Sequence, residues 1–191
     1  SPPVVSPPTT IPSSINYLAL GDSYTIGQSV CETCRFPEQL KSSLRTMYSS
    51  TISLKIIATT GWTTSNLISA IDTQKPESNY DLVTLLIGVN NQYRRRAIEN
   101  YREEFTDLLQ KAIQFAKGDK NHVVVISIPD WGITPFAADK SADKDKVAQE
   151  IDLYNQAKKA ICDEMGITYI DITEHYRIHG MKPESVVSDN L

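Results

Sequence analysis

The sequence predicts an α/β fold in which a five-stranded parallel sheet lies between helices, a three-layer α/β/α sandwich. Three observations support this prediction. Short apolar runs alternate with segments of helical periodicity from about residue 15 onward. One of these runs, residues 81–87, is apolar almost throughout, as expected for a strand covered on both faces. No repeat or later change of composition divides the 191 residues, which is an ordinary size for one domain.

Five segments are expected to form the sheet because they are short and rich in apolar residues: residues 16–21, 53–58, 81–87, 123–128 and 167–172. The first four lead into glycine, proline or polar turn residues, which end a strand. Because the strands alternate with helices, parallel pairing with right-handed crossovers is the expected topology.

Four helices are expected between these strands, where apolar residues recur at helical spacing: residues 36–48, 64–72, 97–117 and 143–165. Pro37 suits the first turn of a helix, whereas Gly118 and Gly166 suit helix ends. Residues 173–191 lack such a period. We expect them to form a loop, without a final helix.

The N-terminal segment is rich in proline, serine and threonine, which is typical of an extended linker. We assign residues 1–14 to this linker and residues 15–191 to the folded domain. No apolar run approaches the ~20 residues of a membrane-spanning helix. A tether of this kind suits a mature chain that has lost its export signal, so we expect a secreted, periplasmic or lipid-tethered protein. A boundary chosen when the fragment was cloned is the plainer explanation of the segment.

The charge of the chain bears on its partners. Its formal net charge is −4, which argues against nucleic acid because phosphate binding requires a basic surface. The compact basic run at residues 94–96 is expected to be a solvated loop or the start of a helix. The sequence gives no indication of the oligomeric state.

The cysteines provide a further constraint. Cys31 and Cys34 form a C-x-x-C motif, but a structural zinc site needs a second pair of ligands, which neither Cys162 nor the histidines supply. A thioredoxin-like redox motif would begin a helix after a strand, and this motif lies within a loop. We expect no metal site, and either a local disulfide or two free thiols. Cys162 falls within a helical pattern and is expected to be buried.

Three predicted strands end in residues suited to acyl transfer, and the carboxyl ends of parallel strands share one edge of a sheet. Ser23 follows the first strand and could act as a nucleophile. The backbone N–H groups of Ser23 and Gly61, with the side-chain amide of Asn90, could bind a developing oxyanion. Each residue also has a plainer interpretation: Asp22 and Ser23 as helix caps, and Gly61, Asn90 and Asn91 as turn residues. Their occurrence at three strand ends favours the catalytic interpretation.

With this pattern the sequence resembles the SGNH (GDSL) hydrolases, a family named for Ser, Gly, Asn and His in four sequence blocks. The segments Gly21-Asp22-Ser23, Thr60-Gly61 and Gly88-Val89-Asn90-Asn91 resemble the first three blocks. Asn91 stands where the family usually has aspartate, at a position of secondary importance. The resemblance extends from about residue 16 to the last residue. It implies a flavodoxin-like SGNH hydrolase fold, Ser23 as nucleophile, an oxyanion hole of Ser23, Gly61 and Asn90, and no metal or organic cofactor.

The fourth block of the family is Asp-x-x-His, in which the histidine takes the proton of the serine and the aspartate orients the histidine. The sequence ends in Ser188-Asp189-Asn190-Leu191, so the resemblance makes Asp189 the acid and places the histidine directly after Leu191. We therefore expect this chain to be truncated before its base and before the C-terminal helix of the family, and to be inactive or nearly so. The alternative bases are His175 and His179, which do not match the position in the family. His122 precedes the fourth strand at the opposite edge of the sheet, where we expect a structural role.

The sequence thus favours a serine hydrolase that cleaves carboxylic esters through an acyl-serine intermediate, with short-chain or carbohydrate O-acetyl esters as substrates. Trp131 and Phe136, after the fourth strand, could line an acyl or sugar pocket or could cover the edge of the sheet. Two alternatives remain. One is a non-catalytic binding module of the same fold that lacks the histidine. The other is a flavodoxin-like nucleotide-binding domain, which is disfavoured because the first loop lacks a glycine-rich phosphate cradle.

Overall fold

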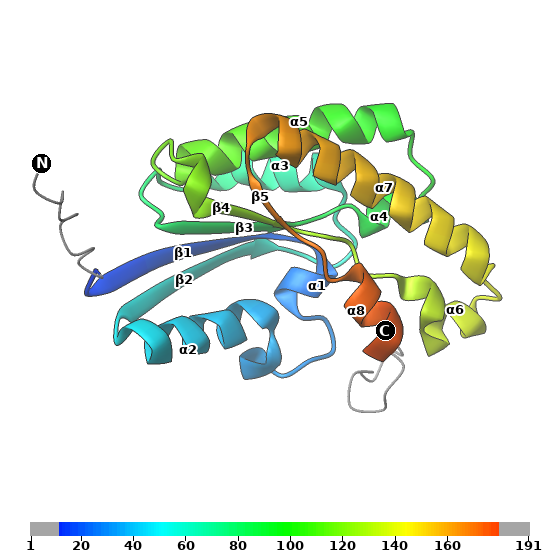
Figure 1. The fold of residues 1–191 in the computed structure, drawn as a ribbon, viewed down its shortest axis with the longest axis horizontal. Coiled ribbons are helices and arrows are strands. Elements are labelled where there is room, and N and C mark those ends of the chain that lie inside the picture. The colour runs from blue at the N-terminus through cyan, green and yellow to red at the C-terminus, as the bar shows by residue number, and fades with distance from the viewer. Residues whose placement is uncertain (1–11, 180–191) are drawn as a thin grey trace, which may run out of the picture.

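A parallel five-stranded sheet forms the centre of the structure, a computed structural model that describes residues 12–179 (Figure 1). The strand order is β2-β1-β3-β4-β5, and all neighbouring strands pair in parallel. The strands are β1 (Ser14–Gly21), β2 (Thr51–Ala58), β3 (Leu82–Leu86), β4 (Val123–Ile126) and β5 (Thr168–Ile170). The predicted fold class is confirmed, and each strand overlaps its predicted segment, with β1 and β2 each beginning two residues earlier than predicted.

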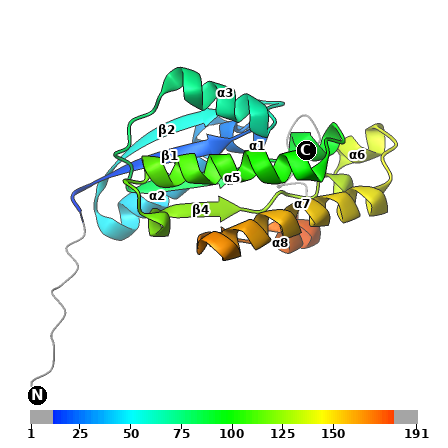
Figure 2. The same cartoon turned by 90° about the horizontal axis from the view of Figure 1, so that it is seen from above.

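The longer helices cover the two faces of the sheet unequally. One face carries α3 (Thr64–Gln74), α5 (Ile98–Phe115) and α7 (Lys144–Met165), which Figure 2 shows in front of the sheet. The other face carries α2 (Phe36–Tyr48). Successive side chains of β1 point to opposite faces of the sheet, so this strand contributes to both cores. Leu18 and Leu20 belong to the core beneath α3, α5 and α7. Tyr17 and Ala19 belong to the core on the side of α2. All four predicted helices are confirmed.

Short helical turns complete the chain: α1 (Ser23–Ile26), η1 (Glu32–Cys34), α4 (Val89–Tyr93), η2 (Lys120–His122), η3 (Trp131–Ile133), α6 (Pro135–Asp139) and α8 (Thr173–His179). The last of these corrects the sequence analysis, because residues 173–179 form a helix where a loop was expected. Its stability comes from outside the segment. The Thr173 N–H donates to Asp171 Oδ1 at 2.9 Å, and Arg177 donates to Asp130 and Asp152, each at 2.8 Å. Asp189 lies outside the described residues.

The register of the sheet positions the candidate site. Gly21, at the end of β1, lies opposite Ala58 at the end of β2 and Leu86 at the end of β3. The three strands therefore end level with one another, and the segments that follow them leave the sheet at the same edge.

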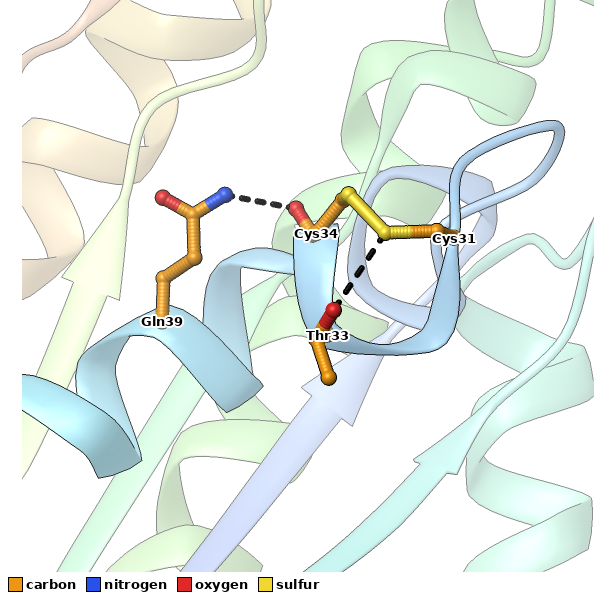
Figure 3. Close-up of a disulfide and its surroundings, with 4 residues drawn as sticks. All are labelled: Cys31, Thr33, Cys34 and Gln39. Carbon is orange, nitrogen blue, oxygen red and sulfur yellow. Dashed lines mark hydrogen bonds between the residues drawn. A yellow bond between two sulfur atoms is a disulfide. The ribbon is translucent and has the colours of Figure 1, made fainter.

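The structure decides between the two states of Cys31 and Cys34 that the sequence left open. Cys31 and Cys34 form a disulfide at the exposed turn η1, just before α2 (Figure 3). Gln39 Nε2, from α2, donates to the Cys34 carbonyl at 2.6 Å and fixes the turn to the helix (Figure 3). Cys162 is a free thiol buried in α7, as predicted.

Residues 12–179 contain no group of three or more His, Cys, Asp or Glu side chains that could hold a metal ion. None of their helices combines the length and the apolar character required to cross a membrane.

Candidate active site

The turn after β1 places Ser23 at the first position of α1, directly after the N-cap residue Asp22. Asp22 Oδ1 accepts the backbone N–H of Tyr24 at 3.1 Å, so the capping role considered for this segment is present. The turn is tight because Gly21 lacks a side chain. A Cβ at this position would lie 2.0 Å from Thr25 Oγ1 and 2.5 Å from the Leu86 carbonyl oxygen. The cap and the close packing together fix the position of Ser23.

The structure brings Ser23, Gly61 and Asn90 together around one pocket with a volume of about 180 Å³. They come from the ends of β1, β2 and β3 respectively, as the parallel topology predicted. The other residues around this pocket, which we call the Ser23 pocket, are mainly large or apolar: Tyr24, Gln28, Thr60, Val89, Tyr93, Trp131 and Phe136.

The hydrogen-bond donors around the pocket are only partly used. Within residues 12–179, the backbone N–H groups of Ser23 and Gly61 donate to no other group of the protein. Gly61 has a positive φ of 81°, and its carbonyl oxygen accepts a hydrogen bond from Arg94 at 2.8 Å. Asn90 Nδ2 donates to the Trp62 carbonyl at 2.9 Å, which uses one of its two N–H bonds. Three N–H groups of residues that line the pocket are therefore without a partner among the described residues. N–H donors of this kind can stabilise an oxyanion if they face it.

Asn91, the position that departs from the usual pattern of the family, is fully buried and has a defined role. Its Oδ1 accepts the backbone N–H of Thr64 at 3.0 Å, and its Nδ2 donates to Thr64 Oγ1 at 2.7 Å. Thr64 Oγ1 donates in turn to Glu104 on α5. Because the hydroxyl of Thr64 gives its hydrogen to Glu104, the residue facing it must supply a donor. An asparagine meets this requirement and an ionised aspartate does not.

Aromatic side chains form one wall of the pocket. Trp131 contacts Tyr93 edge to face, with ring centroids 5.3 Å apart, and its centroid lies 6.0 Å from that of Phe136. The indole N–H of Trp131 donates to Gln92 Oε1 at 2.7 Å, and Gln92 Nε2 donates to Glu150 on α7 at 2.7 Å. The sequence allowed Trp131 and Phe136 either to line a pocket or to cover the edge of the sheet. In the structure both residues line the Ser23 pocket.

Two buried ionisable groups lie beneath the site. Asp22 is fully buried and its Oδ2 has no hydrogen-bond partner among the described residues. Burial raises the pKa of Asp22 to about 7, against the opposing effects of the Tyr24 N–H and the positive charge of Lys158. Lys158 is also fully buried, and its Nζ donates to the Ile126 carbonyl at 2.7 Å. Burial lowers the pKa of Lys158 to about 7, although the charge of Asp22 acts in the opposite direction.

The burial of Lys158 was not predicted from the sequence, although its spacing carried a signal. Lys158 lies four residues after Tyr154 and four before Cys162, both of which are on the buried side of α7. A lysine on an apolar stripe is ordinarily read as reaching toward solvent. In α7 its ammonium group instead lies 5.7 Å from the centre of the Phe105 ring, within the core.

The histidines considered as bases are absent from the lining of the Ser23 pocket. His175 and His179 lie on α8 with ring centroids 4.5 Å apart, and neither lines the Ser23 pocket. His122 ends η2, before β4 and away from the carboxyl edge of the sheet. Asp189, the predicted acid, is outside the described residues. Within the part of the chain that the structure describes, no histidine reaches the pocket.

Helix α8 nevertheless contacts the site. Arg177 Nε donates to the buried carboxylate of Asp130, the residue that precedes Trp131. The hydroxyl groups of Tyr176 and Tyr24 lie close together without an aligned hydrogen bond, and Tyr24 adjoins Ser23. These contacts join elements far apart in the sequence, so periodicity and motifs gave no sign of them.

Comparison of the fold with solved structures identifies esterases of the same architecture. AlinE4, an esterase of the SGNH-hydrolase family, superposes with a TM-score of 0.71 at 15% identity, over 93% of this chain and 85% of that chain. Axe2, an acetylxylan esterase from Geobacillus stearothermophilus, gives a TM-score of 0.68 at 16% identity, over 96% and 88% of the two chains. A lipase/acylhydrolase from Enterococcus faecalis gives 0.66 at 15% identity, over 93% and 86%. At such low identity these matches establish the fold.

The sequence itself gives the family. No curated protein matches it. The sequence model of the GDSL-like Lipase/Acylhydrolase family matches residues 19–191, which is most of the chain. This match includes all three strand ends that surround the Ser23 pocket. The chain therefore belongs to the GDSL-like lipase/acylhydrolase family, whose members are ester hydrolases.

Proposed function

We propose that this protein is a serine hydrolase that cleaves carboxylic esters through an acyl-serine intermediate. Ser23 is the nucleophile, and the oxyanion hole consists of the N–H groups of Ser23 and Gly61 with the side-chain amide of Asn90. One observation carries the proposal. These three residues line a single pocket, and each has an N–H group that no other part of residues 12–179 uses.

The reaction follows from this arrangement. The Ser23 hydroxyl attacks the ester carbonyl, and its proton passes to a base. The negative charge that develops on the carbonyl oxygen is stabilised by the three N–H donors. The intermediate then collapses, the alcohol leaves with a proton, and water hydrolyses the acyl-serine. We propose Asp189 as the acid that orients the histidine base, on the strength of the sequence resemblance alone.

The pocket favours a short acyl group. Its volume of about 180 Å³ lies below the ~300–1,000 Å³ of pockets that hold drug-sized ligands. The rings of Trp131, Phe136 and Tyr93 form its wall, which suits an apolar group such as acetyl or a slightly longer chain. The likeness to an acetylxylan esterase supports carbohydrate O-acetyl esters as one substrate class. We also propose an extracellular or periplasmic location, because an exposed disulfide such as Cys31–Cys34 is typical of exported proteins.

A fluorophosphonate probe tests the nucleophile. The full-length protein is incubated with the probe and its intact mass is measured. An activated serine displaces fluoride and gains the phosphonyl group, and peptide mapping should locate this group on Ser23. Ser23→Ala should abolish labelling, whereas Ser43→Ala, at an exposed position on α2, should not.

Two other outcomes would overturn the assignment. A label on a different serine would exclude Ser23 as the nucleophile. A folded full-length chain that remains unlabelled would favour the non-catalytic binding module.

A further inference from the structure

A second pocket lies on the other side of the aromatic wall. It has a volume of about 580 Å³ and shares Tyr93 and Trp131 with the Ser23 pocket. Three cationic side chains also line it: Arg95 follows α4, Lys140 follows α6, and Lys146 lies in the first turn of α7. We call it the basic pocket.

The charges around the basic pocket are not balanced within the protein. Among the described residues, no carboxylate lies within ion-pair distance of Arg95, Lys140 or Lys146. The two carboxylates in the lining already accept hydrogen bonds from neutral groups. Asp143 Oδ1 caps α7 by accepting the Lys146 backbone N–H at 3.1 Å, and Glu150 Oε2 accepts from Gln92 at 2.7 Å.

An excess of positive charge at this place is unusual for this protein. The whole chain has a net charge of −4, yet the lining of the basic pocket carries three positive and two negative side chains. The first turn of α7, a helix of 22 residues, adds the partial positive charge of a helix N-terminus. Arg95 is also held in the left-handed region at φ 52°, a conformation that costs free energy for a residue with a side chain.

The shared wall connects this pocket to the proposed chemistry. Tyr93 lines both pockets and is 48% exposed, so it forms a rim between them at the surface. The acyl group of an ester fits the small, aromatic Ser23 pocket. An alcohol part that crosses this rim reaches the basic pocket.

We propose that the basic pocket binds a negatively charged group, a phosphate or a carboxylate, on the alcohol part of the ester whose acyl group occupies the Ser23 pocket. This inference rests on the proposed function, because it assigns the second half of the same substrate. Arg95 and Lys146 supply charged donors, and Lys140 is held near the pocket with its Nζ 5.6 Å from the centre of the Phe136 ring. An ester of an uncharged alcohol would give these cations no anionic partner.

Binding is tested first, with catalysis removed. The full-length Ser23→Ala protein is titrated with glycerol 1-phosphate, with glycerate and with glycerol, and the heat of binding is measured. Saturable binding of a charged ligand, and none of glycerol, is expected, and the comparison of glycerol 1-phosphate with glycerate distinguishes phosphate from carboxylate. Arg95→Ala combined with Lys146→Ala should weaken binding about tenfold or more, since two charged hydrogen bonds are lost.

Lys144→Ala provides the matched control, because Lys144 begins the same helix and is exposed but does not line the pocket. It should leave the affinity unchanged. If Lys144→Ala weakened binding equally, the affinity would come from diffuse surface charge and the inference would be overturned. It would also be overturned if neither charged ligand bound. Thermal unfolding of each variant verifies that the fold is retained.

Kinetics then test the two proposals separately. The wild-type full-length protein is assayed on glycerol 1-acetate and on the same ester with a 3-phosphate or in a glycerate framework. A higher kcat/KM for the charged ester is expected, and the Arg95/Lys146 double variant should reduce this preference about tenfold. Binding without hydrolysis of any ester would count against the proposed function and leave the basic pocket standing. Hydrolysis without charge preference would overturn the basic pocket alone.

Discussion

The indole N–H of Trp131 donates to Gln92 Oε1 over 2.7 Å, which ties the aromatic wall of the Ser23 pocket to α4. The same short helix carries Asn90, the proposed oxyanion donor, two residues earlier. Gln92 is almost fully buried, and its other end donates to Glu150 on α7. The aromatic wall and the proposed oxyanion donor are therefore both held by α4, and a change in the position of one should alter the position of the other.

Replacing Gln92 by leucine should destabilise the protein and loosen the pocket wall. The substitution leaves the buried Trp131 N–H without an acceptor, which costs about 1–3 kcal/mol of unfolding free energy. Urea denaturation measures this loss, and KM for a short-chain ester should rise. Gln110→Leu, at an exposed position on α5, should have little effect on either quantity. Equal stabilities for the two variants would show that the hydrogen bond to Trp131 is unimportant.

Asn90→Ala tests the oxyanion hole. Removal of one donor to the developing oxyanion should lower kcat of the full-length protein by roughly 10²–10³-fold, with a smaller change in KM. The hydrogen bond to the Trp62 carbonyl is lost at the same time, so unfolding should be measured alongside turnover. Asn100→Ala, at an exposed position on α5, is the control. An unchanged turnover would return Asn90 to the role of an ordinary turn residue.

Asn91→Asp should be harmful despite the usual aspartate of the family. The new carboxylate could not donate a hydrogen bond to Thr64 Oγ1. It would also place a second negative charge near Glu104, whose carboxylate already accepts the hydrogen of the Thr64 hydroxyl. We expect a loss of about 1–3 kcal/mol in unfolding free energy. Glu104→Gln should recover part of it, because the hydroxyl can then reverse its direction and donate to the carboxylate. A double-mutant cycle measures this coupling, and additive effects would contradict it.

The buried pair Asp22 and Lys158 should give the protein a stability minimum near pH 7. The folded pKa of Asp22, about 7, lies above its ordinary value of 3.8. Between these values the folded chain retains a proton that the unfolded chain releases, so stability falls as the pH rises. The folded pKa of Lys158, about 7, lies below its ordinary value of 10.5. Above pH 7 the unfolded chain binds the additional proton, so stability rises with pH.

Denaturation in urea at pH 5, 7 and 9 measures this dependence. Asp22→Asn combined with Lys158→Met should remove the minimum. The control pair Lys159→Met and Asp163→Asn, an exposed ion pair on the same helix, should leave the shape of the profile intact. The effect assigned to burial would be contradicted if the difference in unfolding free energy, wild type minus the Asp22/Lys158 variant, were greatest at pH 7.

The predictable part of the structure rests on local pattern. The strands could be located because each apolar run ends at a turn-forming residue, as β3 does before Gly88. The meeting of Ser23, Gly61 and Asn90 followed from topology alone, because parallel strands end at the same edge. Their residue types suggested the roles of nucleophile and oxyanion donor, and the resemblance to a family favoured these roles over those of cap and turn residues.

The unpredicted part depends on contacts between distant segments. Gln92 and Trp131 are 39 residues apart, so no local sequence pattern indicates their hydrogen bond. Helix α8 was missed for the same reason, since Arg177 holds it to Asp130 across 47 residues. Lys158 was missed because hydrophobic periodicity does not reveal that a charged group can end inside the core.

The contact between Arg177 and Asp130 sets an order of assembly for the pocket. The hydrogen bonds that shape the Ser23 turn are local, and they can form once the strands around β1 have paired. The loop that carries Trp131 obtains its buried counter-charge only when Arg177 has been synthesised, 47 residues later. At roughly 5–20 residues per second this delay amounts to several seconds. In a growing chain the Ser23 turn can therefore form before Arg177 is available to hold the loop beside it.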